Sequence, residues 1–313
     1  MGRPPRRPKP TTRKGERRRS ERRTSVVLAC VVGVAGCLLY TIAPFTIFTR
    51  TVSSDHTSTN TVNTYVFDGS PVVVVENFFP SEVADRWRDA YQRKWDANAF
   101  VLATNNDGKT DSGNAKFRSG ERKSARREIA NRMLRKGRFS YVKHELPRED
   151  PTLKEIEAYM LSEETRRRVG EALNTTGDRL NETELSDLFA TTFGPGDFLS
   201  AHDDSVAGTY AFVASLAKGP AWRSEFGGQL EFFCKSSRTW CGALGPKYRS
   251  LVLFRTRDPA SKKRIAPIHR VVRVRDEATR AGWLRHGFTG WYNDVGDVMN
   301  DHEIAERNKM RGK

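Results

Sequence analysis

Several features that would place a protein in a narrow class are absent from this sequence of 313 residues. It shows no internal repeat, which excludes the solenoid and propeller architectures. Position 6 is arginine where N-myristoylation requires serine or threonine, so Gly2 is not expected to carry that lipid. Cysteine is scarce, at four residues, and Cys30 and Cys37 both lie within one apolar segment. Apolar residues make up only 37% of the chain, which is low for a compact globular protein.

The net charge of +16 is distributed unevenly. Residues 1–23 contain eleven Lys or Arg and two Glu, so the remaining 290 residues carry only +7. The basic excess is therefore largely a property of the N-terminal tail, and no nucleic-acid partner is expected on this ground. A second basic stretch, 121–138, is predicted to be a solvated helix, with binding to an acidic partner or a phosphate-bearing surface as the alternative.

Residues 25–48 carry no charge and are long enough to span a bilayer, which takes about 20 apolar residues. A buried core helix would rarely be apolar on every face, and a cleaved signal peptide usually has a shorter apolar region of about 7–15 residues. We therefore predict a transmembrane signal anchor. Because the arginine-rich tail 1–24 favours the cytosol, the chain is predicted to be a single-pass type II protein of the endoplasmic reticulum or Golgi membrane, with its body in the lumen.

Two further features agree with a lumenal body. Asn174 and Asn181 each begin an N-glycosylation acceptor sequence. Cys234 and Cys241 flank six residues of a predicted hairpin, where an oxidising compartment would permit a disulfide. Two free thiols are the equal alternative, whereas a metal-binding pair is disfavoured by the wide spacing.

The rest of the chain divides by composition into a stem at 49–70, a folded domain at 71–295 and a polar tail at 296–313. The stem is predicted to be flexible because residues 51–64 are rich in hydroxyl and Asn side chains and poor in apolar ones. Residues 104–120 are predicted to be a mobile loop.

Helices and short strands are both predicted within the domain. One helix begins at Ser81 and buries the face of Val83, Trp87, Tyr91 and Trp95, and a second covers 152–173. The pattern then changes to short apolar segments separated by Gly and Pro, which is typical of a sandwich or barrel. These segments are 185–193, 209–217, 229–233, 250–255, 268–274 and 282–292.

Three residues of this β-rich region have the chemistry of a metal site. His202 and Asp204 are two residues apart, which on a strand directs both side chains to the same face. His269 lies in a second strand-like segment, Ile-His-Arg-Val-Val-Arg-Val. Two imidazoles and one carboxylate form the facial triad that binds non-haem Fe(II) and leaves coordination positions open. A packed histidine with a hydrogen-bonded neighbour is the ordinary alternative for His-x-Asp alone.

The surrounding segments resemble the Fe(II)- and 2-oxoglutarate-dependent dioxygenases of the prolyl 4-hydroxylase superfamily, and are most similar to the branch that hydroxylates a proline of a small-subunit ribosomal protein. The resemblance extends over about 71–293, with its specific motifs within 193–293. The motifs are PGDFLSAHDD, YAFVASLAKGPAWRSEFGGQLEFF, LVLFRT, IHRVVRV and RHGFTGWYND.

The resemblance implies a mainly β fold with flanking helices (α+β), a double-stranded β-helix or jelly roll that the predicted transmembrane helix would precede. It implies that His202, Asp204 and His269 bind Fe(II), and that 2-oxoglutarate and O2 are consumed while a polypeptide is hydroxylated, at prolyl residues, with succinate and CO2 as co-products. Ascorbate commonly keeps such iron reduced. Because the predicted topology separates the domain from ribosomal proteins, a secreted or cell-wall polypeptide is the expected substrate.

The keto acid needs a cation for its distal carboxylate, and arginine binds that planar group through two hydrogen bonds. Arg285 precedes Trp291 by six residues, which is the family's last-strand pattern, whereas Arg280 follows His269 by eleven residues, a spacing found in relatives. Arg285 is preferred because loops absorb insertions more readily than strands absorb a change of register, and this choice implies a lengthened turn through 276–282.

The sequence departs from the family at this pocket, because Phe193 stands where close relatives have tyrosine and Gly287 where a hydroxyl residue is usual.

Two other functions are compatible with parts of the sequence. A type II Golgi glycosyltransferase could use Asp203 and Asp204 as its metal-binding pair, but it would leave His202 and His269 without a role. A catalytically inactive jelly roll would serve as a membrane-tethered binding module.

Overall fold

The computed structural model describes residues 48–53, 59–104, 119–175, 179–218, 221–234, 239–258, 261 and 263–294. The chain divides into two compact units, Met1–Phe45 and Thr46–Lys313, and all of the described residues belong to the second.

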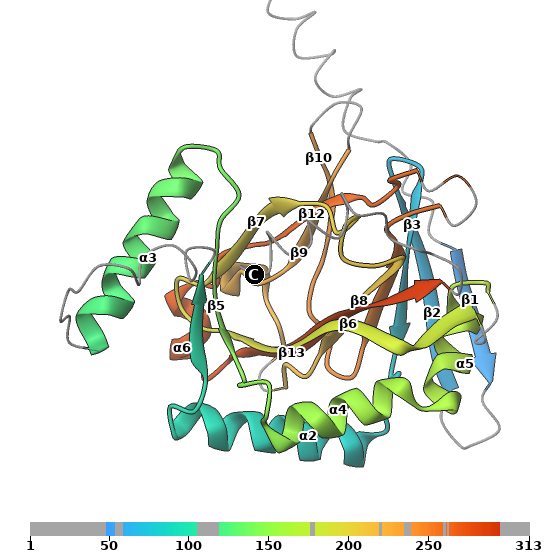
Figure 1. Cartoon of the computed structure of the whole chain (residues 1–313), viewed down its shortest axis with the longest axis horizontal. Coiled ribbons are helices and arrows are strands. Elements are labelled where there is room, and N and C mark those ends of the chain that lie inside the picture. Colours follow the sequence, from blue (N-terminus) through green and yellow to red (C-terminus); the bar gives the residue numbers. More distant parts are fainter. Residues whose placement is uncertain are drawn as a thin grey trace, which may run out of the picture. The chain divides into compact units, whose positions relative to one another are not determined.

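The second unit is built on one antiparallel sheet that forms two layers (Figure 1). The first layer contains, in spatial order, β1 (Phe48–Ser53), β2 (Thr59–Phe67), β3 (Ser70–Glu76), β11 (Leu251–Arg255), β8 (Tyr210–Ser215), β13 (Arg285–Asp294) and β6 (Leu180–Phe193). The order continues into the second layer with β5 (Tyr141–Glu145), β7 (Phe198–His202), β12 (Ile268–Val271), β9 (Leu230–Phe233) and β10 (Trp240–Leu244). A further strand, β4 (Val101–Thr104), pairs with β5.

The buried valines of β3 show how the layers pack. Val72 and Val74 contribute to a core that also contains Phe232 of β9 and Val271 of β12, so this core lies between the two layers. Residues two apart on a strand share a face, and the alternate valines of β3 face the helices instead. A strand covered on both faces is apolar throughout, which explains the uninterrupted valine run.

Three helices cover the outer face of the first layer, namely α2 (Ser81–Asp96), α4 (Pro151–Leu161) and α5 (Glu163–Ala172). Figure 1 shows α2 and α4 below β6 and β13. Trp87 and Tyr91 of α2 are fully buried, and Val83 and Trp95 pack against the same core, so the predicted face of this helix is confirmed. Two short helices, η2 (Ser224–Phe226) and α6 (Asp276–Arg280), lie in connections.

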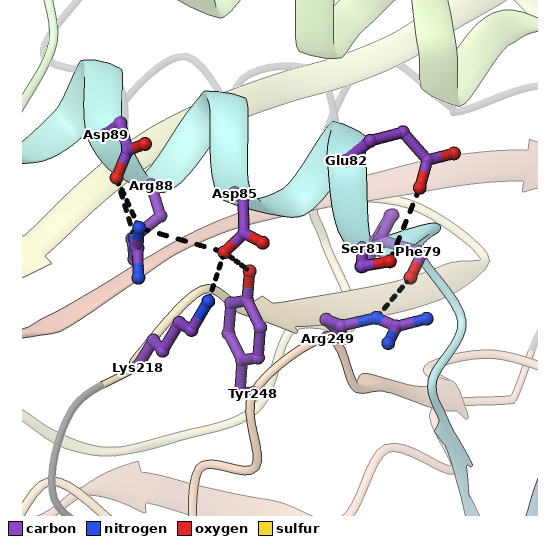
Figure 2. A network of polar contacts seen from close by, with 9 residues as sticks. All are labelled: Phe79, Ser81, Glu82, Asp85, Arg88, Asp89, Lys218, Tyr248 and Arg249. Carbon is purple, nitrogen blue, oxygen red and sulfur yellow. Dashed lines mark hydrogen bonds and ion pairs between the residues drawn. The ribbon is translucent and has the colours of Figure 1, made fainter.

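Polar contacts also fix α2 to the loops beneath it (Figure 2). Asp85 Oδ1 accepts hydrogen bonds from Lys218 Nζ at 2.6 Å and from the Tyr248 hydroxyl at 2.5 Å. These hydrogen bonds lower the pKa of the Asp85 carboxyl group. Arg249, which has a positive φ of 64°, donates from Nε to the Phe79 carbonyl oxygen at 2.6 Å, just before the helix begins. The helix is therefore held at its N-terminal half by charged groups as well as by its apolar face.

The basic stretch forms α3 (Ser119–Arg135), which packs on the second layer rather than on the first. Ala130 of α3 is fully buried in a small cluster with Leu102, Val142 and Phe198. The helix predicted here is confirmed, although most of its surface does not contribute to a core.

The sequence predictions of the elements were correct in kind and less accurate at their boundaries. Each of the six predicted apolar segments contains a strand. The fold is mainly β and its sheet is barrel-like, as expected for a jelly roll. The single helix predicted over 152–173 is wrong, because Ser162 has an extended backbone and its hydroxyl caps the start of α5 by accepting from the Thr165 amide.

The flexible stem predicted at 49–70 is wrong where the structure describes it. Residues 48–53 and 59–67 form β1 and β2, which pair with each other and continue into β3. Val62 and Phe67 are buried, so a few apolar residues separated by β-forming threonines are enough for an edge hairpin. Order therefore begins before Pro71.

Within the part of the chain described here, no helix has both the length and the apolar character needed to cross a membrane. The predicted anchor at 25–48 lies outside the described residues except for Phe48, which begins β1. The tails at 1–24 and 296–313, and 105–118 of the predicted loop, also lie outside them.

Candidate metal and keto-acid site

His202, Asp204 and His269 meet at one end of the space between the layers. His202 ends β7, Asp204 follows it by two residues, and His269 is paired with His202 across the neighbouring strand β12. His202 Nε2 is 3.2 Å from Asp204 Oδ1, and His269 Nε2 is 3.3 Å from Asp204 Oδ2. One ligand atom from each residue lies within 4.8 Å of the other two. The structure therefore brings together the three residues that the sequence proposed as a triad.

Backbone carbonyl groups set the tautomers of both imidazoles. His202 Nδ1 lies 2.9 Å from the Ser200 carbonyl oxygen, and His269 Nδ1 lies 3.0 Å from that of Pro267. A carbonyl oxygen only accepts hydrogen bonds, so each Nδ1 carries the proton and each Nε2 of a neutral ring presents a lone pair. Two nitrogen lone pairs and one carboxylate thus converge, which is a donor set suited to a divalent cation such as Fe(II).

The electrostatics of the site keep Asp204 ionised. Burial alone would raise the pKa of the Asp204 carboxyl group, but the nearby imidazoles of His269 and His202 hold it well below its usual value. Burial alone would lower the pKa of His202, and the charge of Asp204 outweighs that effect and raises it. The carboxylate is therefore available as an anionic ligand throughout the physiological pH range.

The two histidines differ in their access to solvent. His269 is buried and packs against the rings of Phe254 and Phe232, at centroid distances of 5.0 and 6.1 Å. His202 is half-buried and faces Phe139, whose ring lies 5.7 Å away and whose side chain is 42% exposed. The open side of the site is therefore at His202. The sequence did not predict that Phe139 lies here, and the only indication was an aromatic residue directly after a basic run.

Arg285 is a buried cation within the sheet. It begins β13, is 7% exposed, donates from Nε to the Gly228 carbonyl oxygen at 2.7 Å, and lies 5.0 Å from the centre of the Phe193 ring. Burial lowers the pKa of its guanidinium to about 10. Among the described residues no carboxylate forms an ion pair with it. A buried guanidinium without a carboxylate partner is the setting in which an anionic ligand gains most.

Arg280 has the opposite environment. It ends α6, its side chain is 73% exposed, and it pairs with Glu277 at 2.7 Å. The lengthened turn expected through 276–282 contains this helix and then Gly282, which has a positive φ of 70°. The geometry thus places Arg285 inside the sheet and Arg280 at the surface.

The two departures from the family are both buried in the sheet. Phe193 is paired with Arg285 across β6 and β13 and packs in the core between the layers. A Cβ atom at Gly287 would lie 2.3 Å from the Ala214 carbonyl oxygen of β8. Glycine is therefore required at 287 by the close approach of β8 and β13, and a hydroxyl residue there would force the strands apart.

The other predicted sites are a cysteine pair and two asparagines. Cys234 and Cys241 form a disulfide, with Cα atoms 5.7 Å apart, across the β9–β10 hairpin. Asn174 is exposed after the end of α5 and has a positive φ of 56°. Asn181 lies in β6, and its side chain is outside the described part of the chain.

Comparison with known families agrees with this geometry. Residues 188–285 match the model of the 2OG-Fe(II) oxygenase superfamily, and this segment contains His202, Asp204, His269 and Arg285. The matched segment of 98 residues is similar to this superfamily. The match, together with the triad, implies Fe(II), 2-oxoglutarate and O2 as cofactors and co-substrates, with ascorbate as a typical reductant. No curated protein matches the chain.

Solved structures of prolyl hydroxylases show weaker similarity. A prolyl-4-hydroxylase of Pseudomonas putida covers 72% of this chain and 93% of its own, with 17% identity and a TM-score of 0.41. A viral collagen prolyl hydroxylase of Paramecium Bursaria Chlorella virus-1 covers 78% and 97%, with 15% identity and a TM-score of 0.40. A prolyl hydroxylase of Trichoplax adhaerens, in complex with a hypoxia inducible factor peptide fragment, covers 74% and 98%, with 15% identity and a TM-score of 0.35. Similarity at this level does not establish a shared substrate.

Proposed function

We propose that this chain is an Fe(II)- and 2-oxoglutarate-dependent dioxygenase that hydroxylates a polypeptide, at prolyl residues. The observation that carries the proposal is the convergence of two Nε2 lone pairs on the Asp204 carboxylate, within the segment that matches the oxygenase superfamily. Prolyl specificity rests on the resemblance of the motifs around His202 and His269 to the prolyl 4-hydroxylase superfamily.

Each residue of the site has a defined role in this proposal. His202, Asp204 and His269 would hold Fe(II), and the Ser200 and Pro267 carbonyl groups keep the two rings turned toward it. When bound, Fe(II) and 2-oxoglutarate supply the oxidative chemistry, in which O2 is consumed, the keto acid leaves as succinate and CO2, and a C–H bond is hydroxylated. Arg285 would bind the distal carboxylate of the keto acid.

Other features of the chain support a proposed cellular location for this activity. The uncharged segment 25–48 would anchor the protein in the endoplasmic reticulum or Golgi membrane with the basic tail in the cytosol. The domain would then face the lumen, where the Cys234–Cys241 disulfide and a glycan at Asn174 are chemically compatible. The proposed substrate is accordingly a secreted or cell-wall polypeptide.

The test is an anaerobic titration of the full-length protein with Fe(II) and 2-oxoglutarate. A visible metal-to-ligand charge-transfer band should appear, and succinate should form once O2 is admitted. His202→Ala should lose the band, whereas Lys154→Ala, at an exposed position of α4, should keep it. A folded wild-type protein that binds no Fe(II) would refute the proposal and favour an inactive binding module. UDP-sugar hydrolysis without 2-oxoglutarate turnover would instead support the glycosyltransferase alternative.

A further inference from the structure

The charge of α3 is not explained by its packing. Residues 121–138 contain eight Lys or Arg and two Glu, which makes this stretch the main concentration of positive charge after the N-terminal tail. Its contribution to a core is limited to Ala130 and the half-buried Leu134. A solvated helix of this length needs no such excess, because alternating charges would solvate it equally well and would repel less.

Polar contacts nevertheless fix α3 against the segments next to β7 and β12. Arg127 pairs with Asp197, which is fully buried just before β7, at 2.7 Å. Asn131 Oδ1 accepts a hydrogen bond from Arg273, which follows β12, at 2.8 Å. The helix is therefore tied to the residue before β7 and to the segment after β12, the two strands that carry His202 and His269, and its charges have a defined position relative to these strands.

A cleft of about 400 Å³ lies where the chain leaves α3 and passes these two strands. Its lining includes Ala201, which precedes His202, and Arg270, which follows His269, but none of the three triad residues. Phe139, which also lines the cleft, is the exposed ring that faces His202. The cleft thus lies beside the triad, and Phe139 connects the two.

The charge of the cleft is of one sign. Arg138, Arg270 and Arg273 line it, and no carboxylate does so among the described residues. Arg270 pairs with Glu231 and remains 45% exposed, and Arg138 is exposed. Most of the other lining residues are apolar, and Phe139 is the exposed aromatic ring among them. A cationic rim around an apolar wall next to the triad is complementary to an extended polypeptide with acidic side chains.

We propose that this cleft binds an acidic segment of the polypeptide substrate that flanks the hydroxylated residue. The inference rests on the proposed function, since it assigns a property to the substrate of that site. A polypeptide is favoured over a nucleic acid because Phe139 is the one exposed aromatic side chain among the described lining residues, Phe198 being buried, whereas single-stranded nucleic acids stack on several.

The experiment compares two fluorescently labelled proline-containing peptides that differ only in having glutamate or glutamine at the flanking positions. Binding to the full-length protein is measured by fluorescence anisotropy without iron, so the readout does not depend on turnover. The glutamate peptide should bind about fivefold or more tightly at low ionic strength, and the preference should shrink as salt is added. Arg138→Glu should abolish the preference and Arg138→Gln should reduce it. Lys154→Glu on α4, which changes the net charge equally at an exposed site, should leave it intact.

Equal binding of both peptides to the wild type would overturn the inference, even if succinate formation proves the protein to be an oxygenase. Conversely, the glutamate preference without any 2-oxoglutarate turnover would refute the proposed function and retain the acidic-peptide surface. Tighter binding of a single-stranded RNA oligonucleotide than of the glutamate peptide, sensitive to Arg138→Glu, would also overturn the inference.

Discussion

At the scale of single residues, the environment of Arg285 is the clearest evidence that the domain binds an anionic ligand. Its guanidinium is held by one backbone carbonyl and one aromatic face, both uncharged. Leaving a buried charge uncompensated costs roughly 3–5 kcal/mol in proteins where one partner of a buried pair has been removed. A dicarboxylate with one free end would compensate it.

Arg285→Ala should therefore raise the KM for 2-oxoglutarate by about 100-fold, equivalent to about 3 kcal/mol of lost binding. Arg280→Ala should change it less than about twofold, because that side chain is exposed and pairs only with Glu277. Succinate formation at varied keto-acid concentration measures both effects. Loss of 2-oxoglutarate turnover in Arg280→Ala, with normal turnover in Arg285→Ala, would show that the wrong arginine has been chosen.

The neighbouring residue, His286, supports a prediction about pH. Burial lowers its pKa to about 4, helped by the positive charge of Arg88, and its Nδ1 lies 2.8 Å from the Thr192 hydroxyl. An unfolded histidine titrates near 6.5, so below that pH the unfolded state binds more protons than the folded state. The stability that neutral His286 provides above pH 6.5 is therefore lost as the pH falls toward 4. Between pH 7.5 and 5 the loss should be about 2 kcal/mol.

Chemical denaturation at the two pH values tests this prediction. Other groups also titrate over the range, so the informative quantity is the difference between wild type and His286→Gln, which lacks the titrating group. The variant should lose about 2 kcal/mol less than the wild type between pH 7.5 and 5. An identical pH dependence in the two proteins would contradict the assignment.

The identities of the site residues could be predicted from the sequence, but their environments could not. His-x-Asp spacing, a later strand histidine and the resemblance of the surrounding motifs predicted His202, Asp204 and His269 as a triad, and the structure brings these three residues together. The carbonyl groups that set their tautomers depend on backbone geometry that no spacing encodes. The same holds for Gly287, which looks like a lost hydroxyl in the sequence and is a packing requirement of two adjacent strands in the structure.

At the scale of elements, apolar periodicity located the strands because each buries at least one face. It could not give their order, since β11 lies between β3 and β8, and β12 between β7 and β9. Such pairings join segments far apart in the chain. The boundaries failed where a single polar residue decided the backbone, as Ser162 does between α4 and α5. They also failed in β1 and β2, where sparse apolar residues resembled a linker.

The helix α3 shows a different limit. Its sequence predicted a solvated helix correctly, yet gave no reason for its place beside β7 and β12. That place is set by a buried carboxylate, Asp197, which also lies 2.9 Å from His144 Nδ1 and accepts the Gly194 amide at the same distance. A single aspartate in a turn gives no sequence signal that it will be buried or that a helix will be positioned by it.

At the scale of the whole molecule, the two concentrations of positive charge have different proposed partners. The tail at 1–23 would lie at the cytosolic membrane surface, where the positive-inside rule places it. The second, 121–138, belongs to the folded unit and adjoins the site where a substrate would enter. If the anchor spans the membrane once, the basic tail lies in the cytosol and the basic stretch 121–138 lies in the lumen.

The proposed topology predicts the behaviour of the full-length chain, expressed with a C-terminal epitope tag, in sealed microsomes. Added protease should leave the tagged body at close to full length and remove only the N-terminal tail, because the lumen shields residues beyond 48. Detergent should then expose the body to digestion. Endoglycosidase should shift the mobility of the protected fragment, and Asn174→Gln should reduce that shift, since Asn174 is exposed. Digestion of the tagged body without detergent would place the oxygenase domain in the cytosol and make ribosomal or other cytosolic polypeptides the substrates to test.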